Sequence, residues 1–140
     1  MVLLDTNVVS ELMLDFPNPA ILAWMDDQAS RELFVTAVTE AEIRTGVAFL
    51  PEGVRRWGLL DAVERILGGL FADRVLPFDS AAARAYADIA AARRAAGRPM
   101  SQPDCQIAAI ALSCGMAVAT RNVRDFSETG VDVIDPWAGE

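Results

Sequence analysis

The sequence contains neither lysine nor histidine, so all twelve basic residues among its 140 are arginines. Without histidine, the chain cannot build a Ser-His-Asp or Cys-His catalytic site, a histidine-ligated zinc site or an imidazole general base. Without lysine, it cannot supply a P-loop lysine or form a Schiff base. The groups left for chemistry are carboxylates, hydroxyls, two thiols, arginine and a bound metal ion.

Cysteine and long apolar runs are also scarce. Cys105 and Cys114 are nine positions apart, which on one helix puts them on opposite faces, so we expect two small buried thiols and no disulfide, as in a reducing compartment. The longest uncharged run, residues 105–120, is too short to span a bilayer and is broken at Gly115. Because Asp5 and Glu11 interrupt the N-terminus, no signal peptide is expected. These features predict a soluble cytoplasmic protein with no membrane partner.

Positive charge is in short supply as well. Twenty acidic residues against twelve arginines give a net charge of −8 at pH 7, which excludes the basic surface of an architectural DNA binder. A nuclease is still compatible with this charge, because bound metal ions supply positive charge locally. With 53% hydrophobic residues and a mean hydropathy of +0.27, the chain is not disordered. Its length predicts a single domain over residues 1–140.

Short apolar runs alternate with helical patterns along the chain. We expect strands at residues 2–4, 33–38, 75–78, 116–119 and 131–134, and helices at residues 7–13, 19–28, 39–48, 54–67, 80–97 and 103–114. The strands are continuous apolar runs, which is typical of strands buried on both faces. Their alternation with helices indicates βαβ units. The sequence therefore predicts an α/β fold with three layers, α/β/α, around a central, mainly parallel five-stranded sheet.

Acidic residues stand where ligands bind in such a sheet, beyond the carboxyl ends of the strands. Asp5 follows the first strand, and Glu42 lies in the first turn of the helix after the second. Asn122 and Asp125 lie in the loop after the fourth strand. Asp104 opens the helix that leads into the fourth strand, so it joins this set only if the strand order brings it to the same edge.

Each of these acids also has a purely structural explanation. Asp5 could cap the helix that follows it. Glu42 would complete a capping box over residues 39–42, and Asp104 a similar cap over residues 101–104. Asp125 could be a solvated loop charge.

The set as a whole favours a metal site over these separate explanations. Several carboxylates at one edge repel one another unless they are protonated or bridged by a cation. Oxygen ligands without histidine or cysteine select a hard ion, Mg²⁺ or Mn²⁺. Such an ion keeps several waters and commonly meets phosphate as its substrate. The predicted chemistry is therefore metal-assisted attack of water on a phosphodiester.

Four segments carry a resemblance to a known family. They are residues 3–11 (LLDTNVVSE), 39–46 (TEAEIRTG), 103–109 (PDCQIAA) and 119–126 (ATRNVRDF). With these segments in this order and spacing, the chain resembles the PIN-domain nucleases over essentially its whole length. It is most similar to the VapC toxins, including the FitB-like branch, which the ending Asp135-Pro136-Trp137 also resembles.

This resemblance implies roles for the acidic residues. Asp5 and Asp104 match the principal metal ligands of the family, and Glu42 matches its third acid, which acts on the metal directly or through water. Family members often have an acid where this chain has Asn122, whereas here the acid is Asp125, three residues later. Which of the two fills the fourth position, and whether a second metal binds, is left open.

The resemblance and the charge pattern also indicate substrate contacts. Thr6 and Thr120 match positions whose hydroxyls orient ligands or the scissile phosphate. Arg121 and Arg124 flank the proposed site, and we expect them to contact RNA phosphates. Three further arginines near the end of the alanine-rich helix either extend this phosphate track or belong to solvated faces and ion pairs; they are Arg93, Arg94 and Arg98.

The resemblance implies an activity and partners. The activity is that of an Mg²⁺- or Mn²⁺-dependent endoribonuclease toxin, which cleaves RNA by metal-activated water and inhibits translation. The implied assembly is a homodimer inhibited by a cognate VapB-type antitoxin, with operator DNA bound only through the antitoxin. One alternative is a catalytically weak PIN-fold protein that binds an antitoxin or RNA. The other is a phosphoryl-accepting signalling domain, which the missing lysine and missing early acidic pair disfavour.

Overall fold

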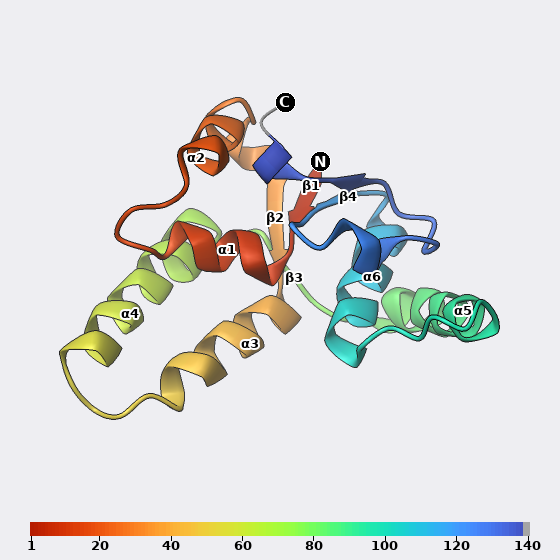
Figure 1. The fold of residues 1–140 in the computed structure, drawn as a ribbon. Helices are drawn as coiled ribbons and strands as arrows, with labels where there is room; N and C mark the ends of the chain where they lie inside the picture. Colours follow the sequence, from red (N-terminus) through yellow and green to blue (C-terminus); the bar gives the residue numbers. More distant parts are fainter. Residues whose placement is uncertain (139–140) are drawn as a thin grey trace.

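Five short parallel strands form the centre of the computed structural model, which describes residues 1–138 (Figure 1). Their order across the sheet is β3-β2-β1-β4-β5, and each neighbouring pair is parallel. Their bounds are Val2–Leu4 for β1, Leu33–Thr36 for β2, Val75–Leu76 for β3, Ala117–Ala119 for β4 and Val133–Ile134 for β5. The N-terminal strand therefore lies in the middle of the sheet, beside a strand from the last third of the chain.

Helices cover both faces of this sheet (Figure 1). Their bounds are Thr6–Leu12 for α1, Pro19–Asp26 for α2, Ala37–Ala48 for α3, Val54–Arg65 for α4, Ser80–Ala95 for α5 and Gln102–Cys114 for α6. The first four helices pack on one face and the last two on the other. The three-layer α/β/α class and the five-stranded parallel sheet predicted from the sequence are confirmed.

The alternation of side chains along β1 separates the two halves of the core. Leu4 packs into one hydrophobic cluster with Val8 and Ile21, and Leu3 packs into the other with Ile107 and Val118. Both leucines are fully buried. Burying a leucine side chain stabilises the folded state by about 2 kcal/mol. Since β1 is apolar on both faces, it gains this stabilisation on both only at the centre of a sheet that helices cover on each side.

The second strand is shorter than predicted. It ends at Thr36, whose hydroxyl accepts a hydrogen bond from the Thr39 amide at 3.0 Å and thereby caps α3. The helix consequently begins at Ala37, two residues before the predicted start. The predicted capping box between Thr39 and Glu42 is not formed, because the Thr39 amide is already bound and the Glu42 carboxylate turns to another partner.

The two glycines that follow the predicted end of the helix at residue 67 lie inside a further helical turn. After α4, the chain continues through a π-helical turn, η2 (Ile66–Leu70), which contains Gly68 and Gly69. Ile66, Leu67 and the following Phe71 are all buried. Their packing keeps this segment coiled despite the low helix propensity of glycine.

The ends of the last two long helices follow the sequence signals. Asp79 caps α5, and Ser101 caps α6 through a hydrogen bond from the Asp104 amide. Gly115 ends α6 in the left-handed conformation, with φ of 67°. The two cysteines are free, as expected, but only Cys105 is buried; Cys114, on the opposite face of α6, is exposed.

Within residues 1–138, no helix is both long enough and apolar enough to cross a membrane.

Candidate active site

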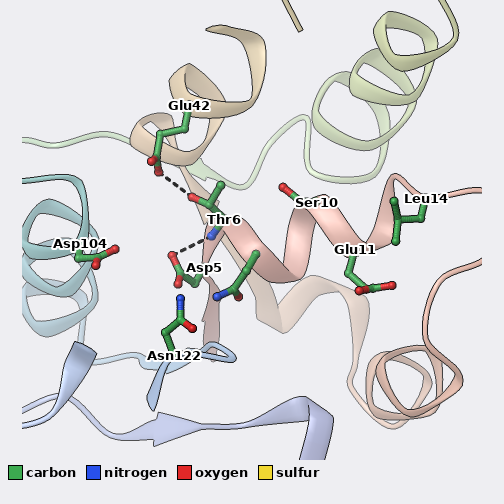
Figure 2. A pocket seen from close by; sticks show the side chains of 9 residues that line it. Asp5, Thr6, Ser10, Glu11, Leu14, Glu42, Asp104 and Asn122 are labelled. Atoms are coloured by element: carbon green, nitrogen blue, oxygen red, sulfur yellow. Dashed lines mark hydrogen bonds between the residues drawn. The ribbon is translucent and has the colours of Figure 1, made fainter. Parts of the chain in front are cut away.

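A pocket of about 490 Å³ lies at the carboxyl ends of the central strands (Figure 2). Most of its lining comes from α1 and the residues flanking it, and the rest from α3, α6 and the loop after β4. The lining residues are Asp5, Thr6, Asn7, Ser10, Glu11, Leu14, Glu42, Asp104 and Asn122. The strand order thus brings Asp104 to the same pocket as Asp5, which the sequence alone could not establish.

Asp5 is the most buried acid of this pocket, with 4% of its surface exposed. It directly follows β1 and caps α1, where its Oδ1 accepts a hydrogen bond from the Thr6 amide at 2.8 Å. The pKa of Asp5 is raised to about 6, mainly by burial and to a smaller extent by the charges of Asp104 and Glu42, while hydrogen bonds from Thr120 and Thr6 act in the opposite direction. The fold therefore holds a fixed carboxylate in a place where its charged form lacks a compensating cation.

Thr120 supports Asp5 from beneath the pocket. It is fully buried, and its hydroxyl donates to Asp5 Oδ2 at 2.8 Å. The Thr120 hydroxyl oxygen in turn accepts hydrogen bonds from the Asn122 amide at 3.0 Å and from Asn7 Nδ2 at 3.2 Å. The family resemblance implies that the Thr120 hydroxyl orients either a metal-ligand residue or the scissile phosphate, and the hydrogen bond to Asp5 is compatible with the first of these roles.

Glu42 is exposed at the opposite wall and is held by Thr6 (Figure 2). The Thr6 hydroxyl donates to Glu42 Oε1 at 2.7 Å and lies 3.0 Å from the Thr39 hydroxyl. Because the single Thr6 proton goes to Glu42, Thr39 donates the second bond. This chain of hydroxyls links α1 to α3 and fixes the Glu42 carboxylate at the pocket.

Asp104 points into the pocket from the first turn of α6, facing Asp5 (Figure 2). Its pKa is raised above the ordinary value, mainly by burial and also by the charges of Asp125 and Glu42. The guanidinium of Arg93 acts in the opposite direction. Repulsion among carboxylates, which the sequence predicted for this set, is therefore present in the folded chain.

The two candidates for the fourth position occupy different places. Asn122 lines the pocket (Figure 2), whereas Asp125 is exposed in the short helix η3 (Val123–Phe126) and is not part of the lining. The charge of Asp125 nevertheless acts on Asp104, so it lies on the Asp104 side of the site.

The donor set suits a hard divalent ion held by few protein ligands. Within residues 1–138, no three acidic or cysteine side chains are arranged as a preformed metal cage. Asp5, Asp104 and Asn122 each present an oxygen donor to the pocket, and the pKa values of both carboxylates are raised. Mg²⁺ binds through one or two carboxylates and keeps several waters, so the number and type of the donors from Asp5 and Asp104 fit this ion.

The predicted arginine contacts separate into surface and buried groups. Arg121 and Arg124 are both exposed, and the main-chain amide of Arg121 donates to Asn7, which lines the pocket. Arg93, by contrast, is buried, and its Nη1 donates to the carbonyls of Asp125 and Ser127 at 2.9 and 2.8 Å. It therefore cannot belong to a surface phosphate track, because its hydrogen bonds tie α5 to the η3 segment.

Asn7 was missed as a pocket residue in the sequence, and the burial of Arg93 was not predicted. Asn7 lines the pocket and bridges to Thr120, and its place within the first matching segment was a usable signal. Arg93 shares the buried face of α5 with Ala82 and Ile89, at helical spacings of eleven and four residues. That periodicity could have indicated a buried arginine.

Comparison with known proteins places this chain in a family. The model of the PIN domain matches residues 2–131. The plasmid stability protein StbB of Pseudomonas syringae pv. tomato is 45% identical, covering 98% of this chain and 99% of that protein. The VapC ribonuclease Y4jK of Sinorhizobium fredii is 43% identical, covering 98% of each chain. Toxin FitB of Neisseria gonorrhoeae is 39% identical, covering 98% of this chain and 99% of that one.

Solved structures agree with this assignment. The crystal structure of FitAcB from Neisseria gonorrhoeae contains a chain with a TM-score of 0.90 and 39% identity, covering 98% of this chain and 99% of that chain. DNA-bound VapBC from Salmonella typhimurium contains one with a TM-score of 0.83 and 25% identity, covering 96% and 97%. From the matched domain, the full-length similarity and the shared fold, the chain belongs to the PIN-domain family, in the branch that contains VapC and FitB.

Proposed function

We propose that this chain is a metal-dependent endoribonuclease and the toxin of a toxin–antitoxin pair. The observation that carries the proposal is the pocket in which Asp5, Asp104 and Glu42 meet although they come from three separate elements. Relatives that align over nearly the whole chain are named a VapC ribonuclease and a toxin. A phosphoryl-accepting domain is not supported by these comparisons.

The residues of the pocket would divide the work as follows. Asp5 and Asp104 hold Mg²⁺ or Mn²⁺, with Asn122 as a further oxygen donor. When bound, the ion supplies positive charge for the phosphate oxygens and acidifies a water molecule. Thr6 and Thr120 keep two of the carboxylates oriented through their hydroxyls.

Glu42 is our choice for the group that accepts the proton of the attacking water. The chain has no histidine or lysine, so a carboxylate must do this. Thr6 binds Glu42 Oε1, and within residues 1–138 no hydrogen bond occupies Oε2. Glu42 therefore keeps a free oxygen on a fixed side chain, whereas both oxygens of Asp5 accept hydrogen bonds, Oδ1 from the Thr6 amide and Oδ2 from the Thr120 hydroxyl.

Incubation of the purified protein with single-stranded and structured RNA tests the activity. We expect cleavage with Mn²⁺ or Mg²⁺ to give 5′-phosphate and 3′-hydroxyl ends, and excess EDTA to stop it. Asp104→Asn should abolish cleavage, whereas Asp88→Asn, an exposed position on α5, should not change it. Cleavage that continues in EDTA, or an Asp104→Asn protein as active as the parent, would reject the proposal. Binding of RNA without cleavage would favour the catalytically weak alternative.

The proposed partner is an antitoxin. Structures similar to this chain were solved as FitAB and VapBC complexes, some of them with DNA. We expect this chain to bind a small VapB-type antitoxin, to reach operator DNA only through it, and to act on RNA in the cytoplasm. Expression of the chain alone should stop growth and translation, and co-expression with the antitoxin should restore both. Unimpaired growth with active protein present would contradict the toxin role, but not the nuclease.

A further inference from the structure

Arg121 lies against the ring of Trp137, with its guanidinium carbon 5.3 Å from the ring centroid. Arg121 follows β4 and Thr120, and its main-chain amide donates to Asn7 Oδ1 at 3.3 Å. Since Asn7 lines the acidic pocket, the backbone of Arg121 is anchored at the pocket rim. A cation at that rim thus rests on an aromatic ring from the end of the described chain.

Trp137 is well placed to hold a side chain still. It lies in the short helix η4 (Pro136–Ala138), where its amide donates to Asp135 Oδ1 at 2.9 Å and the preceding Pro136 is buried. Its partly buried ring packs against the core cluster that includes Ile21 and Trp24 of α2. The ring is therefore fixed on one side by the core and available on the other to Arg121.

The contact leaves the polar edge of Arg121 free. Among residues 1–138, the Arg121 side chain has no hydrogen bond and no ion pair, whereas Arg98 binds Glu128 and Arg44 binds Glu40. A guanidinium on a ring face keeps its five N–H donors around the edge, and these match the oxygens of a phosphate. Holding the side chain in advance also removes part of the entropy cost of ordering it on binding.

We propose that Trp137 is a positioning residue, which presents the Arg121 guanidinium to a backbone phosphate of RNA next to the bond that is cut. This inference rests on the proposed ribonuclease function. We do not expect the Trp137 ring to stack on an RNA base, because Arg121 covers the ring face on the pocket side. The contribution of Trp137 to substrate binding then passes entirely through Arg121.

A double-mutant cycle tests this dependence. Cleavage of a single-stranded RNA with Mn²⁺ is measured for Trp137→Leu, Arg121→Gln and the double variant. Trp137→Leu should raise KM about fivefold and leave kcat within about twofold, consistent with the modest strength of cation–π contacts. In the Arg121→Gln background, Trp137→Leu should raise KM less than about twofold further. Trp137→Phe, which keeps an aromatic face, should restore most of the affinity.

Two controls separate positioning from folding and from the activity itself. Trp57→Leu removes an exposed tryptophan from α4 and should leave KM unchanged. The slope of log KM against log salt should fall by a similar amount in Arg121→Gln and Trp137→Leu, because both lose the same phosphate contact. The inference would be overturned if Trp137→Leu left KM unchanged, or if it raised KM equally with and without Arg121. Cleavage by the parent protein would still support the proposed function in either case. A parent protein that neither binds nor cleaves RNA would overturn both.

Discussion

The Thr120 hydroxyl donates a hydrogen bond to Asp5 Oδ2 over 2.8 Å, although 115 positions separate the two residues. The register of the central strands explains this contact, since Ala119 at the end of β4 pairs with Leu4 at the end of β1. The residues that follow the two strands therefore lie side by side. The hydrogen bond satisfies one oxygen of a buried carboxylate and joins the beginning of the chain to its last third.

Replacement of Thr120 by valine should destabilise the protein by about 2 kcal/mol, because a hydrogen bond to a buried carboxylate is lost without a change in shape. Unfolding in urea at pH 7 without metal measures this loss. Thr120→Ser keeps the hydroxyl and should recover most of the stability. A valine variant as stable as the parent would show that Asp5 needs no partner at this position.

The stability of the metal-free protein should depend on the ionisation of Asp5. The pKa of Asp5 is about 6 in the folded protein, against 3.8 for an aspartate side chain in the unfolded chain, so the folded state binds this proton more tightly than the unfolded state. The contribution of Asp5 to stability is therefore complete below pH 4 and is lost as pH rises through 6, by about 3 kcal/mol. Urea unfolding between pH 4 and 7 in EDTA, compared with Asp5→Asn, isolates it. Parallel pH profiles for the two proteins would contradict the shift.

The stabilisation of the protein by Mg²⁺ should increase over the same pH range. A metal binds the deprotonated carboxylate, so below pH 6 the ion must displace the proton that burial favours on Asp5. The rise in Tm on adding Mg²⁺ should be small at pH 5 and larger at pH 7.5. Asp104→Asn should reduce the rise at every pH, and Asp88→Asn should not. An equal shift of Tm at pH 5 and 7.5 would argue against a site built on Asp5.

The buried Arg93 should be far more important for stability than its exposed neighbour. Its guanidinium donates to the carbonyls of Arg98, Asp125 and Ser127, and all three would lose this donor in Arg93→Met. We expect a loss of about 3 kcal/mol. Arg94→Met, one position along α5, should cost less than about 0.5 kcal/mol. Thermal unfolding of both variants checks this, and similar Tm values would show that the η3 segment does not depend on Arg93.

Two glycines should respond to alanine in opposite directions. Gly115 ends α6 with φ of 67°, so Gly115→Ala should cost about 1 kcal/mol even though no atom lies within 4 Å of the added carbon. Gly58 lies inside α4, also with open space around it, and Gly58→Ala should add up to about 1 kcal/mol. Urea unfolding of the two single variants decides the signs.

Much of the fold was predictable because its signals are local. Apolar runs such as residues 2–4 and 117–119, helix caps such as Ser101 and Gly115, and the spacing of turns all act within a few residues. Three acids of the pocket were also identifiable, because Asp5 follows a strand, Asp104 opens a helix and Glu42 lies close to the start of one, although in its second turn and not in the predicted first. What the sequence left open for Asp104 was the strand order, which depends on contacts between distant segments.

The errors arose where a distant contact competed with a local one. Glu42 has the spacing of a capping box with Thr39, but the hydroxyl of Thr6, 36 positions earlier, takes its carboxylate. Gly68 has the local character of a helix stop, but the burial of Leu67 and Phe71 keeps the chain coiled. Local propensities are worth a few tenths to about 1 kcal/mol, less than a buried side chain contributes.

The central place of β1 has a consequence for biosynthesis. Asp5 is translated well before Thr120, which contacts it from 115 positions later in the sequence. The sheet cannot close around β1 until β4 has been translated. A nascent chain that ends before β4 therefore lacks a complete acidic pocket.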